Sequence, residues 1–267
     1  GCPIGCQMCD AGGHYRGKLS EDDMASQIEF LIESRFPDGH VPARQFKIQF
    51  ARMGEPALNP QVIDLLRHLP DRISAPGLMP SLSTIAPHGC EEFFQQLIEV
   101  KNEIYPEGNF QFQFSIHTTD QVLRDELIPV KKWDFSRMRD FGKQYYRPGD
   151  RKITLNFALA ESSPVEAKVL TEYFDPEIFL IKITPLNPTY QAQEWGLKSY
   201  LNGERKLSQN PLVDGLEKAG YDVILSIGEL EENQIGSNCG QYVQRHLASD
   251  GSLGTGYSYQ VKKVTRE

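Results

Sequence analysis

The chain has 267 residues, 39% of them hydrophobic and 24% charged, which is ordinary for a globular protein and long enough for one large α/β domain. It contains no run of roughly 18 apolar residues and no signal-peptide pattern, so we expect no membrane span. Its net charge of −8, from 28 basic and 36 acidic residues, counts against nucleic acid as a partner, because proteins that grip nucleic acid usually have a basic balance or a basic patch.

The chain opens with three of its five cysteines, Cys2, Cys6 and Cys9, in a C-x3-C-x2-C pattern. The odd count and this crowding argue against a disulfide framework, so we expect a reducing, cytoplasmic environment. A loop of this kind can turn three thiolates toward one point and leave one iron of a [4Fe–4S] cube open for another group. Zinc normally takes four ligands from paired knuckles, and the sequence has no second knuckle; a zinc site or incidental cysteines remain the alternatives. Because the chain starts at Gly1 without an initiator methionine, we expect further sequence upstream.

Helices and strands alternate along the rest of the chain. Ser20 and the acidic residues after it predict the start of the first helix. The periodicity predicts helices near 21–35, 60–69, 90–103, 120–128, 134–146, 165–173 and 206–219. It predicts strands near 46–50, 81–85, 110–115, 153–157, 178–183 and 223–225, the fifth as a nearly continuous apolar strand. Six βα units predict an α/β fold with a partial (β/α)6, TIM-like barrel over residues 1–248, including a C-terminal cysteine loop, and a flexible tail over 249–267.

Function collects at the carboxyl ends of parallel strands, and this rule selects a small polar set. The set comprises 54–56, Ser83, 115–117 and 184–187. Gly54 lets backbone carbonyls approach a ligand and accept hydrogen bonds from an ammonium group. Ser83, Ser115 and Asn187 can bind hydroxyl or carboxylate groups, although each taken singly is also an ordinary cap or turn residue.

Two further residue types stand out, cysteine and histidine. Cys239 is flanked by small polar residues and followed by glycine, which favours an accessible loop where a thiolate could act as nucleophile over a buried, inert cysteine. Cys90 begins a predicted helix and is interpreted as structural. His14 and His117 could bind ligands or relay protons, or be structural histidines.

Seven stretches, taken together, are specific: 2–9, 50–59, 82–84, 114–117, 123–129, 182–188 and 238–241. With these stretches, in this order across almost the whole chain, the protein resembles the class A radical S-adenosylmethionine (SAM) methyltransferases of the RlmN/Cfr type. That family methylates ring carbons of adenine in ribosomal or transfer RNA.

The resemblance implies a role for each matched position. Cys2, Cys6 and Cys9 would hold the [4Fe–4S] cluster, and Cys239 would first accept a methyl group from one SAM. A second SAM, cleaved at the cluster, would give a 5′-deoxyadenosyl radical that takes hydrogen from the methylated cysteine, and the carbon radical would add to an sp² carbon. An external one-electron donor such as flavodoxin or ferredoxin is also implied. The residues implied to contact SAM are Gly54, Glu55, Ser83, Ser115, His117 and Asn187.

The chain departs from the family in two ways. The family's second catalytic cysteine, its accessory domain and its first barrel strand lie upstream of the position of Gly1. The acidic balance also differs from that of an RNA enzyme, since phosphate neutralisation needs several Lys or Arg. Two alternatives therefore stand beside an RNA methyltransferase: an enzyme of the same lineage that modifies a small molecule or peptide, and an iron–sulfur module that binds or senses without catalysis.

Overall fold

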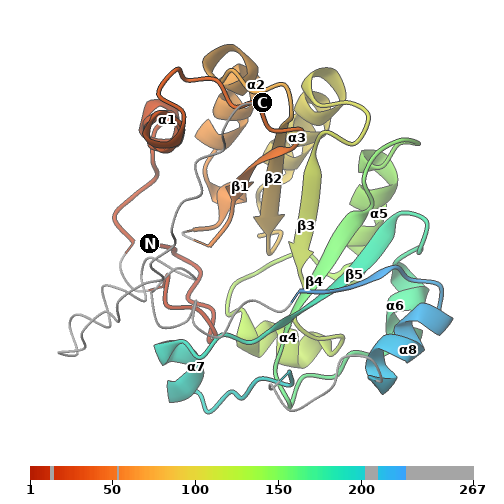
Figure 1. Ribbon diagram of the computed structural model, residues 1–267. Coiled ribbons are helices and arrows are strands. Elements are labelled where there is room, and N and C mark those ends of the chain that lie inside the picture. Colours follow the sequence, from red (N-terminus) through yellow and green to blue (C-terminus); the bar gives the residue numbers. More distant parts are fainter. Residues whose placement is uncertain (13–14, 53, 202–209, 227–267) are drawn as a thin grey trace.

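Six parallel strands form one sheet, and neighbours in the sheet follow one another in the chain. The structure is a computed structural model and describes residues 1–12, 15–52, 54–201 and 210–226. In Figure 1 the strands change direction steadily along the sheet, as in an open barrel. This confirms the predicted α/β class and the partial barrel. The strands are β1 (Phe46–Phe50), β2 (Leu78–Thr84), β3 (Gln111–Ser115), β4 (Ile153–Leu159), β5 (Phe179–Pro185) and β6 (Val223–Leu225).

Helices connect the strands and cover one face of the sheet (Figure 1). The first begins where the sequence predicts, because Ser20 Oγ accepts a hydrogen bond from Asp23 N at 3.1 Å and Asp23 Oδ2 accepts one from Ser20 N at 3.0 Å. No helix in the described ranges is both long and apolar enough to cross a membrane. The helices are α1 (Glu21–Arg35), the 3-10 turn η1 (Pro56–Leu58), α2 (Gln61–Arg72), α3 (Glu91–Ile104), α4 (Gln121–Leu127), α5 (Phe135–Tyr145), α6 (Ala167–Tyr173), α7 (Tyr190–Glu194) and α8 (Pro211–Lys218).

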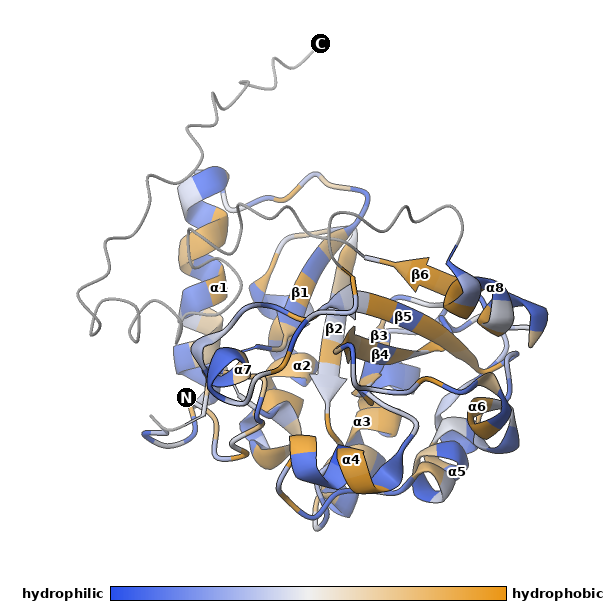
Figure 2. Cartoon of the chain, turned by 90° about the horizontal axis from the view of Figure 1, so that it is seen from below, coloured by the Kyte–Doolittle hydropathy of each residue, from blue (hydrophilic) through white to orange (hydrophobic). Residues whose placement is uncertain are grey.

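The two faces of the sheet differ in character, because successive side chains of a strand point to opposite sides. The outer face is apolar and packs on the helices, with Phe112, Phe114 and Phe157 in the main core. The inner face carries polar side chains such as Gln113, Asn156 and others at alternate positions. Figure 2, coloured by hydropathy, shows hydrophobic and hydrophilic residues mixed along single strands. The helix side therefore holds the core, and the inner side is left for ligands.

Helix α2 continues past the predicted end near residue 69 and contains Pro70. A proline within a helix removes one donor, so the carbonyl of Leu66, four residues earlier, loses its usual partner. Tyr105, the C-cap of α3, supplies the replacement: its hydroxyl donates to Leu66 O at 2.5 Å. A residue outside the helix thus allows it to run on to Arg72.

Several other boundaries differ from the predictions. Strand β2 begins at Leu78 and includes Pro80, which pairs with Ile48 of β1 ahead of the point where β3 joins at Ser81. The short helices η1 and α7 were not predicted. Helix α8 starts at Pro211, capped by the Asn210 side chain, and residues 206–209 of the predicted helix lie outside the described residues. The predicted cysteine loop and tail beyond residue 226 also lie outside them.

Candidate functional site at the carboxyl ends of the strands

The predicted SAM-contacting residues lie along one edge of the sheet. Gly54 and Glu55 follow β1, Ser83 is the penultimate residue of β2, and Ser115 ends β3. His117 follows β3, and Asn187 follows β5 and is exposed. All strands are parallel, so their carboxyl ends share this edge. Contact of these residues with SAM stays a prediction.

The N-terminal cysteine loop is closed on itself and anchored at the same edge. Cys2 N donates to Ala11 O at 2.7 Å, which joins the two ends of the loop, and Cys9 N donates to Cys6 O at 3.1 Å within it. Ile4 is buried in a small cluster with Ile85, Leu127 and Ile128, which come from the end of β2 and from α4. The loop is therefore packed against the carboxyl end of β2.

Asp10 fastens the other side of the loop to the segment that follows β5. Its two carboxylate oxygens accept hydrogen bonds from Tyr190 N at 3.0 Å and Gln191 N at 2.9 Å, at the start of α7. Thr189 Oγ1 adds a hydrogen bond to Met8 O at 3.0 Å. Figure 1 shows the N-terminal segment beside α7. This role of Asp10 was not predicted from the sequence. An acid directly after Cys9 was the available signal, but its partners lie far away in the sequence.

Glu55 uses its side chain as a clamp between two strand ends. Its carboxylate is buried and accepts three hydrogen bonds: from Ala57 N at 3.0 Å, from the Thr84 hydroxyl at 2.5 Å and from Ile85 N at 2.9 Å. Burial raises the pKa of the Glu55 carboxyl to about 7 against the opposing effect of these donors. The carboxylate thus joins the turn after β1 to the end of β2, a role that the sequence analysis did not assign to it.

The cysteine thiols lie against this turn. Burial raises the pKa of the Cys2 thiol, and backbone hydrogen bonds from Ile4 and Glu55 act in the opposite direction. Burial, followed by the neighbouring Cys2 and Glu55, raises the pKa of the Cys6 thiol to about 12. Both thiols are neutral at ordinary pH, so a metal that binds them must displace their protons. Cys2, Cys6 and Cys90 are free cysteines.

The donor set fits an iron–sulfur cluster better than a single ion. Within the described ranges no group of three or more His, Cys, Asp or Glu side chains is placed to hold one metal ion. In a cube each cysteine binds a different iron atom, so its three sulfurs stand farther apart than the ligands of one zinc ion. Three thiols on one closed loop offer the sulfur donors that an iron–sulfur cluster takes.

His117 is held as a neutral donor at the end of β3. Its ring atom Nδ1 faces Ala158 N at 3.1 Å and must accept that proton, which leaves the ring proton on Nε2. Burial, together with the nearby Arg124 charge, lowers the pKa of His117 to about 4. The residue adopts a positive φ of 68°, unusual for a side chain of this size. These features fix both the orientation and the charge of the ring.

Arg124 of α4 holds the residue after β2 in place through buried hydrogen bonds. Its guanidinium is buried and donates to Trp133 O at 2.9 Å and to Ile85 O at 3.3 Å, which ties α4 to the residue that follows β2. Burial lowers the pKa of Arg124 to about 10, so it stays charged. Ser83 is held differently, since its hydroxyl accepts from Gln113 Nε2 at 3.1 Å.

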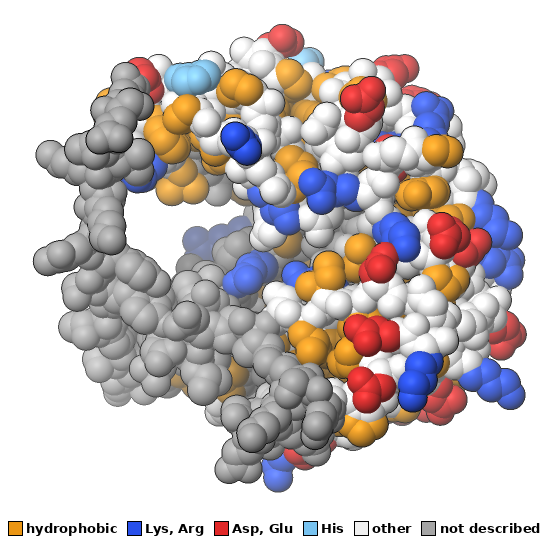
Figure 3. Space-filling view, turned by 45° about the vertical axis from the view of Figure 1, so that its right-hand side comes forward, with side chains coloured by type: hydrophobic (Ala, Val, Ile, Leu, Met, Phe, Trp, Pro, Cys, Tyr) orange, Lys and Arg blue, Asp and Glu red, His pale blue; other side chains and the backbone are white. Residues whose placement is uncertain are grey.

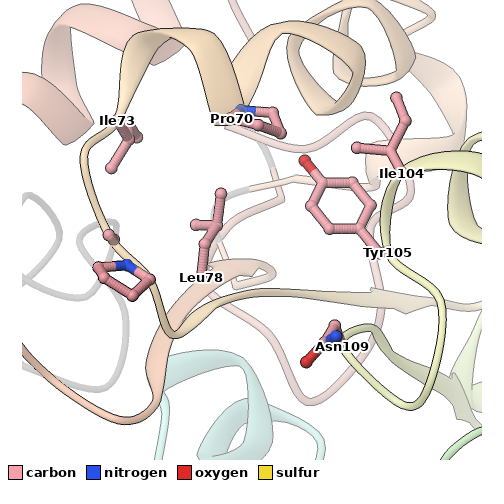
Figure 4. Close-up of a pocket in the computed structure, with 8 residues that line it drawn as sticks. Pro70, Ile73, Leu78, Ile104, Tyr105 and Asn109 are labelled. Carbon is pink, nitrogen blue, oxygen red and sulfur yellow. The ribbon is translucent and has the colours of Figure 1, made fainter.

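A separate shallow pocket lies at the other end of the sheet. It is formed by the ends of α2 and α3 and by the first residue of β2, and most of the residues that line it are of apolar type (Figure 4). Tyr105 and Asn109 supply its polar atoms, and the Tyr105 hydroxyl is already used by Leu66 O. This pocket is therefore not part of the strand-end site.

Sequence comparison identifies distant relatives. No protein-family model matches the chain. It is 26% identical over 260 residues to a probable dual-specificity RNA methyltransferase RlmN of Cutibacterium acnes, with 90% of this chain and 59% of that protein covered. The protein with the same description from Rhodococcus opacus is also 26% identical, over 90% of this chain and 64% of its own length. A third, from Desulfitobacterium hafniense, is 25% identical over 86% of this chain and 64% of its own length. The chain thus spans about three fifths of the length of these relatives.

Structural comparison shows the same architecture in solved proteins. A radical SAM methyltransferase from Sphaerobacter thermophilus superposes with a TM-score of 0.65 and 20% identity, over 90% of this chain and 67% of that one. A spore photoproduct lyase superposes with a TM-score of 0.55 and 13% identity, over 85% of this chain and 74% of that one. Streptococcus suis SuiB bound to S-adenosylmethionine superposes with a TM-score of 0.52 and 14% identity, over 85% of this chain and 48% of that one. The fold is therefore the partial barrel of radical SAM proteins.

Proposed function

We propose that this chain, a distant homologue of the RlmN methyltransferases with the radical SAM partial-barrel fold, is a radical SAM methyltransferase. The observation that carries the proposal is the arrangement of the cysteine loop. Three thiols sit on one closed loop, and the Cys2 thiol accepts a hydrogen bond from the backbone of Glu55, in the turn after β1. A cluster ligand and the turn expected to bind SAM are thereby adjacent, although far apart in the sequence.

Each residue of the site has a defined task in this proposal. Cys2, Cys6 and Cys9 hold a [4Fe–4S] cluster, which when bound supplies the electron that cleaves SAM to a 5′-deoxyadenosyl radical. Backbone carbonyls at Gly54 and Glu55 accept hydrogen bonds from the SAM ammonium group, and the Glu55 side chain keeps their turn in place.

The remaining polar residues serve the other end of the cofactor. Ser83, Ser115 and Asn187 offer hydroxyl and amide groups to the SAM ribose and carboxylate. His117 donates its Nε2 proton without taking up a second one, because the pKa of His117 is held near 4. Cys239 carries the methyl group and delivers it to an sp² carbon; this residue lies outside the described residues.

An adenine in RNA is the leading substrate, because the relatives are described as RNA methyltransferases. The protein would then work in the cytoplasm, where flavodoxin or ferredoxin can supply electrons. The second candidate is a small molecule or peptide substrate, and the net charge of −8 favours it. Filter binding to RNA fragments at several salt concentrations separates the two, since tight binding that weakens steeply with salt is expected only of an RNA enzyme.

The proposal is tested by replacing Cys239 in the reconstituted holoenzyme. Cys239→Ala should abolish methyl incorporation into product, whereas Cys90→Ala, which removes a buried thiol at the start of α3, should leave it intact. Unchanged methyl incorporation in Cys239→Ala would eliminate the methyl-carrier role. Loss in both variants would point to a stability effect, which thermal unfolding of each variant detects.

A further inference from the structure

Two lysines lie on the inner face of the sheet, one on β1 and one on β5. Lys47 is the second residue of the edge strand β1, and its Nζ donates to Gln111 Oε1 at 2.5 Å, reaching across β2 to β3. Lys182 is in the middle of β5, paired with Asn156 of β4. Its position is one that the sequence analysis interpreted as part of an apolar strand. Neither lysine belongs to the predicted SAM-binding set.

The curvature of the sheet brings these charges toward each other. In a flat sheet, β1 and β5 would be four strand spacings, roughly 19 Å, apart, well beyond the roughly 8–10 Å over which exposed charges act at ordinary ionic strength. Burial is the main cause that lowers the pKa of Lys47. The charge of Lys182 is the second cause, and the charge of Arg151 adds a smaller contribution. The pKa of Lys182 is itself lowered by burial and by the charge of Arg52.

The described strands of this inner face carry no negative charge to balance the lysines. Every inward-facing position of the six described strands carries a neutral or a basic side chain, although acidic residues exceed basic ones in the whole chain. Among the ion pairs of the described residues, none includes Lys47 or Lys182, whereas the buried Lys101 is paired with Asp150. Figure 3 shows several Lys and Arg side chains at the border of a hollow on the side of the molecule seen there. Within the described strands, the positive charge of the two lysines is therefore not balanced by a carboxylate.

We propose that the inner face of the half-barrel binds a phosphate group of the substrate, with Lys47 and Lys182 as its cationic ligands. Lysine binds phosphate as a point charge, and two lysines match the nearly two negative charges of a terminal phosphate at neutral pH better than the single charge of a carboxylate or a phosphodiester. Neutral donors stand beside them, notably Gln111 and Asn156. The site rests on the proposed function, because it places the charged part of the substrate on the inner face of the sheet, beside the residues assigned to SAM.

The test follows lysine resonances by NMR after reductive ¹³C-methylation of the full chain, with inorganic phosphate as the probe and potassium chloride at equal ionic strength as the reference. The Lys47 and Lys182 signals should shift in a saturable way, and that of the exposed Lys168 on α6 should not. Lys182→Met should weaken phosphate binding at least tenfold at Lys47, and Lys168→Met should leave it unchanged. Equal responses of Lys182 and Lys168 in the wild-type protein would overturn the proposal without need of any variant.

Further probes identify where the phosphate comes from. AMP should bind more tightly than adenosine, and equal affinity would overturn the proposal. A response to AMP, but not to a short RNA without terminal phosphates, assigns the site to a small phosphorylated substrate; a response to both, with the RNA bound more tightly than AMP, assigns it to an RNA backbone. No cluster or SAM is needed for these measurements, so the phosphate site and the proposed radical chemistry can fail separately.

Discussion

The Glu55 clamp gives the sharpest quantitative prediction. Thr84→Val keeps the shape of a side chain that is 1% exposed but removes the hydroxyl, which donates to Glu55 Oε1 and accepts from Ala86 N at 2.9 Å. A hydrogen bond to a charged group contributes roughly 1.5–3 kcal/mol, and a buried amide left without a partner costs roughly 1–3 kcal/mol. Allowing for relaxation, the free energy of unfolding should fall by about 2–4 kcal/mol.

The assay is urea unfolding at pH 8, above the Glu55 pKa of about 7, so that the carboxylate is mostly ionised. Thr84→Ser is the matched control, because it keeps the hydroxyl and loses only one methyl group, which should cost about 1 kcal/mol. A double-mutant cycle with Glu55→Gln should give a coupling energy of roughly 1.5–3 kcal/mol. Equal losses in Thr84→Val and Thr84→Ser, or a coupling energy below about 0.5 kcal/mol, would refute the clamp.

Three further predictions concern residues around the site and the core. Asp10→Asn should speed hydrogen exchange of the α7 amides about tenfold, because an amide oxygen replaces only one of two acceptors; unchanged exchange would contradict this. The pKa of His117 in the folded protein, about 4, is below its unfolded value of about 6.5, so the protein should lose stability as the pH falls from 6.5 toward 4. His117→Asn has no ring to protonate, so between pH 6.5 and 4 its free energy of unfolding should fall by roughly 1–2 kcal/mol less than that of the wild-type protein. Unfolding measured across this pH range tests the prediction. Tyr105→Phe should cost about 1–2 kcal/mol of unfolding free energy, and far less in a Pro70→Ala background, where residue 70 regains an N–H for Leu66 O; equal costs in both backgrounds would contradict the pairing.

The sheet was predictable because its signals are local. Phe112 and Phe114 alternate with polar residues along β3, and Ser20 with Asp23 marks the start of α1 within four residues. Such patterns need no knowledge of the rest of the molecule. They sufficed for six strands, for most of the helices and for the edge at which the polar residues gather.

What the sequence could not supply is the partner of each buried charge. Glu55 is clamped by Thr84, and Asp10 by the amides of Tyr190 and Gln191, and no local pattern specifies either pairing. The same reason explains the early end given to α2, since the hydroxyl that compensates for Pro70 comes from another helix. The role of Lys182 could not be predicted for a related reason. Most of its strand is apolar, and the sequence does not show that the curved sheet brings Lys182 near Lys47 of β1.

The central claim is that Cys2, Cys6 and Cys9 hold an iron–sulfur cluster that cleaves SAM. The most direct measurement is anaerobic reconstitution with iron and sulfide, followed by reduction in the presence of SAM and quantification of 5′-deoxyadenosine. The wild-type protein should retain about four irons per chain and form 5′-deoxyadenosine, and a variant with all three cysteines changed to alanine should do neither. A colourless wild-type protein that carries zinc or no metal and leaves SAM intact would contradict the account.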